Sequence, residues 1–134
     1  MIPKFRAWKK AGKELGRVGQ ITFELDGSVS HVLFKGEFLD FNVSINEIIL
    51  MQSTGLHDKN CQEIFEGDLV RQVRTQPTTE NETITGVVTM IEGTWLIMND
   101  NEQLASKLWS ETDENEIIGN IYENNDILED KKWN

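Results

Sequence analysis

The sequence predicts a mostly β protein, and its composition is the first reason. The 134 residues include three alanines against ten threonines, and isoleucine and valine together number 21. Alanine is the strongest helix former, whereas β-branched residues suit a pleated strand. Leu, Ile, Val and Phe together make up 28% of the chain, which is enough apolar material for a folded core. We therefore expect a folded β protein and not a helical bundle.

Alternation is the second reason, and it begins in residues 1–52, which we expect to form an N-terminal β unit. Residues 2–8 alternate like a strand, with Ile2, Lys4, Arg6 and Trp8 on one face and Pro3, Phe5 and Ala7 on the other. Residues 9–16 contain Gly12 and Gly16 and predict a basic loop. Residues 38–43 predict a short extended segment, and the apolar stretch 46–51 predicts either a strand or a short helical turn.

Turn signals are the third reason. Asp26-Gly27 separates the apolar patterns of residues 18–25 and 29–34, and this dipeptide is a strong two-residue hairpin signal. Glu92-Gly93 separates residues 84–91 and 94–98 in the same way. These two turns predict two β-hairpins, one in each half of the chain.

Residues 53–134 predict a second unit, a small barrel that is followed by an acidic C-terminal segment. Residues 52–68 are expected to be a long connection, and a strand begins at Leu69. Residues 75–83 contain no apolar side chain and predict a mobile loop tip. Further strands are expected at 103–109 and 116–122. Five short strands joined by tight turns suit a partly open barrel, and the sequence shows no repeat of fixed period.

Cysteine usage and hydropathy predict the compartment. The chain has one cysteine, Cys61, so it can form no internal disulfide, which fits a reducing environment. The longest apolar run, residues 48–51, is far too short to span a bilayer. The basic N-terminus is followed by no apolar stretch of the kind found in secretory signals. We expect a cytoplasmic protein that does not bind membranes.

Charge is distributed unevenly along the chain. The net charge is −10, but residues 1–20 carry +5, and residues 99–130 contain ten acids and one base. The acidic body repels nucleic acid at long range. The basic segment either meets the acidic tail of its own or another copy, stays solvated, or binds a polyanion. Its candidate interaction residues are Lys4, Phe5, Arg6, Trp8, Lys9, Lys10 and Arg17.

The sequence contains no strong candidate for a metal-binding or catalytic site. His57 and Cys61 are four residues apart, but they lie in a loop-like context, and two ligands do not close a zinc site. Residues 99–102 lack the glycine and the terminal glutamate of a calcium loop. The acids of residues 111–116 form a solvated run, whereas acid–base catalysis needs two pKa values that are pushed apart. We assign no catalytic, metal-binding or cofactor-binding residue and expect no enzyme.

The four tryptophans divide into two pairs. Trp95 and Trp109 occur in strand-like contexts and are expected in the core. Trp8 and Trp133 lie near the ends of the chain. They pack on each other, on a partner subunit, or on nothing.

Three blocks resemble the YopX family of phage and prophage proteins. They are residues 2–8 (IPKFRAW), residues 50–70 from Leu50-Met51-Gln52-Ser53 through Glu66-Gly67-Asp68-Leu69-Val70, and residues 116–124 (EIIGNIYEN). The chain departs from the family pattern at Cys61, where glycine is usual, and at Lys9, where an acid is usual. Residues 75–83 resemble an inserted or lengthened loop.

The resemblance implies a small β-rich protein with an SH3-like barrel in its C-terminal part, encoded in phage or integrated phage DNA. It brings no activity, cofactor or catalytic residue with it. Our first hypothesis is a non-enzymatic phage accessory protein that serves as a protein-interaction module for a host or phage protein. The alternatives are a nucleic-acid-associated protein that uses the basic segment, and an acidic mimic of nucleic acid that occupies a host protein. We also expect a homo-oligomer with Phe5 and Trp8 among its apolar contacts.

Overall fold

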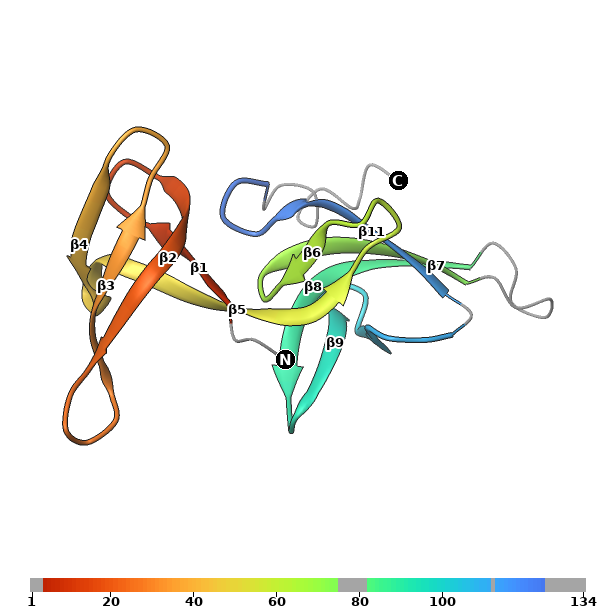
Figure 1. Cartoon of the computed structure of the whole chain (residues 1–134). Coiled ribbons are helices and arrows are strands. Elements are labelled where there is room, and N and C mark those ends of the chain that lie inside the picture. Colours follow the sequence, from red (N-terminus) through yellow and green to blue (C-terminus); the bar gives the residue numbers. More distant parts are fainter. Residues whose placement is uncertain (1–3, 75–81, 112, 125–134) are drawn as a thin grey trace. The chain divides into compact units, whose positions relative to one another are not determined.

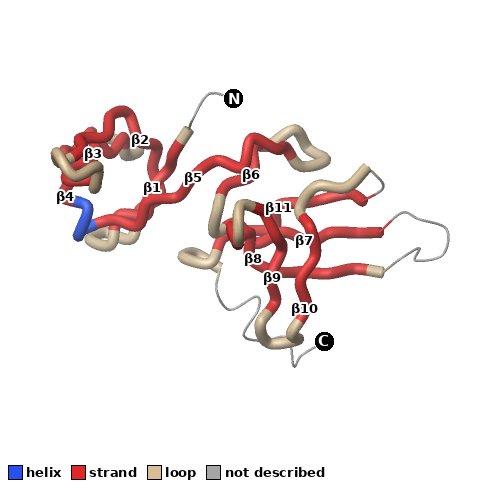
Figure 2. Tube along the Cα trace, turned by 90° about the horizontal axis from the view of Figure 1, so that it is seen from below, coloured by secondary structure: helices blue, strands red, loops and turns tan. Residues whose placement is uncertain are grey.

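The computed structural model describes residues 4–74, 82–111 and 113–124 (Figure 1). Within these ranges the chain forms 11 strands and one short 3-10 helix, η1 (Ile45–Glu47). Figure 2 shows that strands and loops make up nearly all of the described chain. The prediction of a mostly β protein is therefore confirmed. No helix among these residues has the length and hydrophobicity that a membrane span requires.

The chain divides into two compact units, Met1–Ser53 and Thr54–Asn134. The first unit contains β1 (Phe5–Lys9), β2 (Glu14–Phe23), β3 (Val29–Lys35), β4 (Asp40–Ser44) and the start of β5 (Ile48–His57). These strands are joined in the order β4-β3-β2-β1-β5, and β6 (Glu63–Phe65) is the next strand in the same sheet. Between β4 and β5, the Ser44 hydroxyl accepts a hydrogen bond from the Asn46 N–H and caps η1.

The first hairpin forms where its turn signal lies. Gly27 has a φ of 90°, a left-handed conformation that glycine adopts without strain. The Asp26 carboxylate accepts hydrogen bonds from the Ser28 N–H and hydroxyl, which fixes the turn. Strands β2 and β3 follow on either side, so the predicted hairpin is confirmed. Its loop is not the predicted two-residue turn, because Glu24 bonds Ser28 across three residues and Gly27 has positive φ but Asp26 does not.

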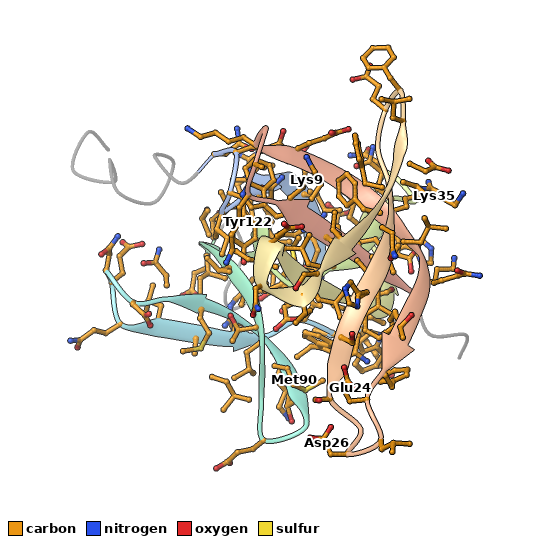
Figure 3. The ribbon with its side chains drawn as sticks, turned by 90° about the vertical axis from the view of Figure 1, so that its left-hand side faces the viewer. Lys9, Glu24, Asp26, Lys35, Met90 and Tyr122 are labelled. Carbon is orange, nitrogen blue, oxygen red and sulfur yellow. The ribbon has the colours of Figure 1, made fainter. Side chains whose placement is uncertain are left out.

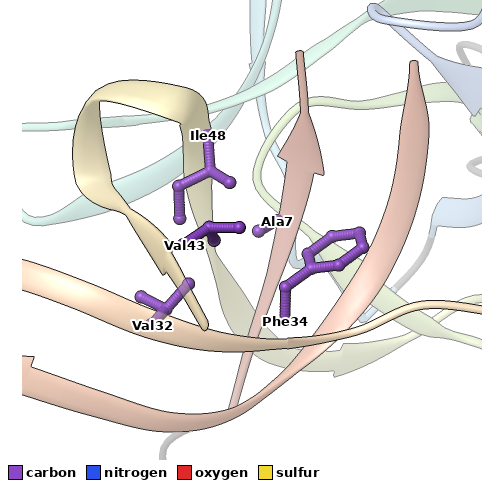
Figure 4. Close-up of a cluster of buried hydrophobic side chains, with 5 residues drawn as sticks. All are labelled: Ala7, Val32, Phe34, Val43 and Ile48. Atoms are coloured by element: carbon purple, nitrogen blue, oxygen red, sulfur yellow. The ribbon is translucent and has the colours of Figure 1, made fainter. Parts of the chain in front are cut away.

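A small apolar cluster holds the first unit together (Figure 4). Its members come from four strands and are Ala7, Val32, Phe34, Val43 and Ile48. Gly16 lies inside β2, where it pairs with Ala7, and not in the loop predicted for residues 9–16. The Phe34 ring packs over it. A Cβ atom at Gly16 would lie 2.6 Å from Phe34 Cζ, so only glycine leaves room for the ring.

The second unit repeats the strand order of the first. It contains β7 (Asp68–Arg74), β8 (Thr83–Ile91), β9 (Thr94–Asn99), β10 (Leu104–Lys107) and β11 (Asp113–Asn120), in the order β10-β9-β8-β7-β11. Counted from β1 and from β7, the first five strands of the first sheet and the five strands of the second both read 4-3-2-1-5, and β6 is a sixth strand of the first sheet. The core of this unit consists of Ile64, Val70, Val88, Ile97 and Leu108.

Side chains, and not backbone pairs, connect the two ends of the second sheet. Among the described residues, neither sheet closes into a barrel through its strand ladder. The Gln72 amide on β7 instead donates to the carbonyls of Lys107 and Leu108, at 3.1 and 3.4 Å. The Asn115 amide on β11 also donates to the Leu108 carbonyl, at 2.7 Å. These bonds join the end of β10 to the opposite side of the sheet and leave the ladder itself open.

Several local expectations need correction. Residues 52–68 are not one long connection, because β5 continues to His57 and β6 follows at Glu63. Trp109 is 61% exposed, so its expected place in the core is wrong. Trp95 is partly buried and packs against the second cluster, in agreement with the prediction. Trp133 and residues 75–81, most of the expected loop tip, lie outside the described residues.

Candidate interaction surface

Three cations lie in register across the first sheet, and we call them the cationic row. Arg6 on β1 pairs with Arg17 on β2, and Arg17 pairs with Lys35 on β3. Directly paired residues project from the same face of a sheet. Like charges in such positions repel one another, so this arrangement disfavours the isolated fold and favours an anion on that face.

Two members of the cationic row, Lys35 and Arg17, differ in how they are neutralised within the described chain. Lys35 Nζ lies 3.2 Å from Asp40 Oδ2, and both side chains are about half exposed. The Lys35 stem crosses Gly19, where an added Cβ would lie 2.8 Å from Lys35 Cε. Arg17 is exposed, and no acid in residues 4–74, 82–111 or 113–124 pairs with it. Arg17 is therefore the member of the row that is most available to a partner.

The remaining candidates divide between two faces of the unit. Lys9 lies on the opposite side of β1 from Arg6, with Nζ 4.7 Å from the centroid of the Phe41 ring. Lys9 and Lys35, labelled in Figure 3, come from β1 and β3. Lys10 Nζ donates to the Asn46 carbonyl at 3.2 Å and so anchors η1. The basic segment is therefore not one continuous patch.

The aromatic candidates are less accessible than the sequence suggested. Trp8 is 9% exposed, so its ring is already packed within the chain. Phe5 is partly buried, and Lys4 is exposed. The Lys4 carbonyl accepts a hydrogen bond from the Ser53 N–H, which fixes the start of β1 against β5. These positions leave the cations, and not the aromatics, as the accessible groups of this segment.

In the second unit, the carboxylates of Asp58 and Glu116 stabilise the fold. Asp58 Oδ1 accepts hydrogen bonds from the N–H groups of Asn60 and Gln62, both at 2.9 Å, and Oδ2 accepts one from Ile117 at 3.0 Å. The Lys59 N–H donates to the Asn115 carbonyl at 2.9 Å. The turn of residues 58–62 therefore covers part of the outer edge of β11.

Glu116 reinforces this contact electrostatically. Its Oε1 lies 2.6 Å from Arg71 Nη2, and its Oε2 lies 3.8 Å from Lys59 Nζ. The hydrogen bond from Arg71 lowers the pKa of Glu116 despite some desolvation. Burial raises the pKa of Asp58, but the backbone donors of Ile117, Gln62 and Asn60 outweigh it and lower that pKa. Both carboxylates are ionised at neutral pH, so the pair offers no general acid.

The other residues considered as metal-binding candidates, Cys61 and residues 99–102, also lie in turns. Cys61 is exposed, at the tip of the 58–62 turn. The Asn99 amide donates to Glu102 Oε1 at 3.0 Å and to the Thr85 carbonyl at 2.8 Å, closing the turn between β9 and β10. Within the described ranges, no three His, Cys, Asp or Glu side chains lie close enough to hold a metal ion.

Lys35 was not among the predicted interaction residues, because a two-residue turn at Asp26-Gly27 would pair Leu25 with Ser28 and place Arg17 opposite Gly36. The Glu24 N–H bonds the Ser28 carbonyl, and counting back from this pair without interruption places Arg17 opposite Lys35. The strands contain two irregularities, one near Gly19 in β2 and one near Ser30 in β3. They lie on opposite strands and cancel, so the simple count holds.

Comparison with known proteins extends this description. The family described as YopX protein matches residues 4–129. Protein EF1440 from Enterococcus faecalis has a similar crystal structure, with a TM-score of 0.67 and 27% sequence identity, over 96% of this chain and 99% of that chain. Protein yopX from Bacillus subtilis is also similar, with a TM-score of 0.61 and 15% identity, over 93% and 97% of the two chains. At that identity the second likeness shows the fold alone. No curated protein matches the chain.

Proposed function

The chain belongs to the YopX family, and from its cationic row we propose that it acts by binding an acidic segment of another protein, and not by catalysis. The family resemblance supports a role as an accessory protein of a phage or prophage, in the cytoplasm of the host cell. The observation that carries the proposal is the register Arg6–Arg17–Lys35, in which Lys35 pairs with Asp40 and Arg17 is exposed.

The charge distribution favours a short acidic protein segment over nucleic acid. Residues 1–53 contain seven Lys or Arg and six Asp or Glu, whereas residues 54–134 contain six and 17. Long-range repulsion from the acidic part grows with the charge of the partner. A duplex carries one charge per about 1.7 Å and is repelled more strongly than a segment with a few carboxylates.

A titration of the full chain into a fluorescent oligoglutamate peptide tests the proposal by anisotropy. We expect binding that Arg17→Gln weakens severalfold, because this variant removes the unpaired guanidinium of the row. Lys13→Gln is the matched control, since Lys13 is exposed and lies outside the row. No binding of the peptide, or equal binding by both variants, would contradict the proposal.

A parallel titration with a random DNA duplex tests the alternative function, because the same row also suits phosphates. Affinity for DNA that exceeds affinity for the peptide, and that falls steeply with salt, would favour a nucleic-acid-associated protein instead.

A further inference from the structure

The outer edge of β4 carries backbone groups that its own sheet does not use. The Gly36 N–H bonds the Leu39 carbonyl at 3.0 Å, which makes residues 36 and 39 a hydrogen-bonded pair. Such pairs recur at every second residue of an antiparallel ladder. Phe34–Phe41 is therefore a hydrogen-bonded pair, and Leu33–Asn42 is not. The N–H and carbonyl of Asn42 consequently point away from β3, toward the open edge.

This edge is flat and weakly protected. β4 is the terminal strand of its sheet, at the outer rim of its unit in Figures 1 and 2, and its register with β3 is unbroken. It contains no proline and no lysine, two residues that commonly prevent an edge strand from pairing with another chain. Phe38 and Leu39, which precede it, are 88% and 65% exposed.

The edges of the second unit differ from β4. The turn of residues 58–62 bonds to Asn115 and Ile117 on β11. The Gln72 amide bonds to the carbonyl of Lys107 at the end of β10. At the other end of the first sheet, β6 has only three residues, and its Phe65 N–H donates to Asp68 Oδ2 at 2.8 Å. Within the described chain, the β4 edge is therefore the more accessible site for adding a strand.

We propose that two copies of the chain pair through this edge, with β4 antiparallel to β4 of the partner subunit and Asn42 on the two-fold axis. Asn42 then faces Asn42 of the partner subunit, and the two exchange both backbone hydrogen bonds. Phe41 faces Val43 of the partner subunit, and Asp40 faces Ser44 of the partner subunit.

The sequence of β4 favours this register and a second copy of the chain as the partner strand. The outward backbone groups belong to residues 40, 42 and 44, and these residues can face one another about a two-fold axis at any residue from 40 to 44. An axis at Asp40 would place two carboxylates directly opposite each other, which is destabilising. An axis at Ser44 would run the pairing into η1. Only an axis at Asn42, the middle residue, pairs all five residues of β4 with the partner strand, and it leaves no like charges opposed.

Self-complementarity on both faces favours a second copy over an unrelated strand. An aromatic residue opposite a β-branched residue, as in Phe41 with Val43 of the partner subunit, is a favourable cross-strand pair. The interface is therefore isologous, as expected for a closed dimer.

Analytical ultracentrifugation of the full chain, over about 1 to 200 µM, tests the proposal. We expect the wild type to dimerise in this range. Asn42→Pro should be monomeric, because proline removes an N–H that only the partner uses, a change that edge strands tolerate. Asn42→Lys and Asn42→Glu should each weaken dimerisation about tenfold or more, since like charges would meet on the axis.

An equimolar mixture of Asn42→Lys and Asn42→Glu gives the sharpest test, because the two charges would then be opposite. We expect this mixture to dimerise at least tenfold more tightly than either variant alone. Gln20→Lys, a charge change at an exposed residue of β2, should leave the wild-type dimer intact. A monomeric wild type, a dimer unaffected by the Asn42 variants, or a mixture that does not recover would each overturn the proposal.

This inference does not rest on the proposed function, because Arg17 is not part of the β4 edge. Loss of peptide binding in Arg17→Gln with an intact dimer, or loss of the dimer in Asn42→Lys with intact peptide binding, separates the two.

Discussion

Cys61 has a backbone conformation that favours glycine. Its φ is 65°, within the left-handed region. The conformation costs an ordinary residue about 1 kcal/mol, because Cβ approaches the following carbonyl. The neighbouring Asp58 holds the turn in place through its hydrogen bonds to Asn60 and Gln62, so this residue is kept in the strained region.

Replacing Cys61 with glycine should therefore stabilise the protein. We expect Cys61→Gly to raise the free energy of unfolding by about 0.5–1 kcal/mol, less than the full strain because glycine gains freedom in the unfolded chain. Urea denaturation measures the change. Cys61→Ala is the control, because it removes the thiol and keeps Cβ. Equal stability of the two variants would show that strain at this position is unimportant.

Asp58 should make the stability depend on pH. Its pKa is lowered from 3.8 in the folded protein, because three N–H donors outweigh the effect of burial. A group whose folded pKa lies below its unfolded value stabilises the fold above the unfolded value, and this contribution is lost as the pH falls through the folded pKa. Glu116 has the same sign, with Arg71 as the first cause.

We therefore expect the urea midpoint to fall between pH 6 and pH 3. Asp58→Asn removes one of the titrating groups, so its midpoint should be lower at pH 6 and should fall less on acidification. Asp100→Asn is the control, since Asp100 is exposed in the turn between β9 and β10. A variant at position 58 with the pH dependence of the wild type would contradict this assignment.

At the scale of elements, Gln72 is the residue that connects the ends of the second sheet. It is fully buried on β7, and its amide donates to Asn115 Oδ1 as well as to the end of β10. Its carbonyl oxygen accepts a hydrogen bond from the Ser106 hydroxyl at 2.7 Å. Because these hydrogen bonds satisfy its buried amide, Gln72 holds β7, β10 and β11 in one arrangement.

Gln72→Leu keeps the approximate volume and removes these bonds. We expect it to lower the free energy of unfolding by about 2–4 kcal/mol, because several buried polar groups lose their partner at once. Chemical denaturation with fluorescence detection measures the loss. Gln20→Leu is the matched control on an exposed position of β2 and should change stability by less than about 0.5 kcal/mol. A similar small effect at both positions would show that the network does not matter.

Strand prediction succeeded where turns are marked and failed where they are not. Asp26-Gly27 and Glu92-Gly93 both lie between paired strands, as predicted. The second half of β5 was predicted as a connection, because Ser53, Thr54 and Gly55 resemble loop residues. In the fold, Ser53 and Thr54 are buried, and the Thr54 hydroxyl donates to the Ile64 carbonyl. Tertiary hydrogen bonds therefore help to continue the strand past Gly55, a residue of low strand propensity.

At the scale of the whole molecule, the negative charge is concentrated in one unit. Residues 54–134 carry six Lys or Arg against 17 Asp or Glu, whereas the charges of residues 1–53 nearly balance. Such an excess destabilises the folded state through self-repulsion, and salt screens this repulsion over about 10 Å at 0.1 M.

We expect the urea midpoint to rise when NaCl is raised from about 20 to 300 mM. Glu114 is exposed on β11 and adds to the excess. Glu114→Gln should therefore raise the midpoint at low salt and reduce the response to salt. A midpoint that falls with salt would mean that attractive ion pairs, such as Arg71 with Glu116, outweigh the repulsion.

The sequence by itself determined the β class, the two hairpin turns, the uneven charge and the family. These features are local, since propensity, turn geometry and composition act over a few residues. The tertiary structure alone decided which distant residues meet: Arg6, Arg17 and Lys35 across three strands, Asp58 with Ile117, and Gln72 with the end of β10. It also decided that both units share one strand order without a sequence repeat, because the order depends on long-range pairing that many sequences can satisfy.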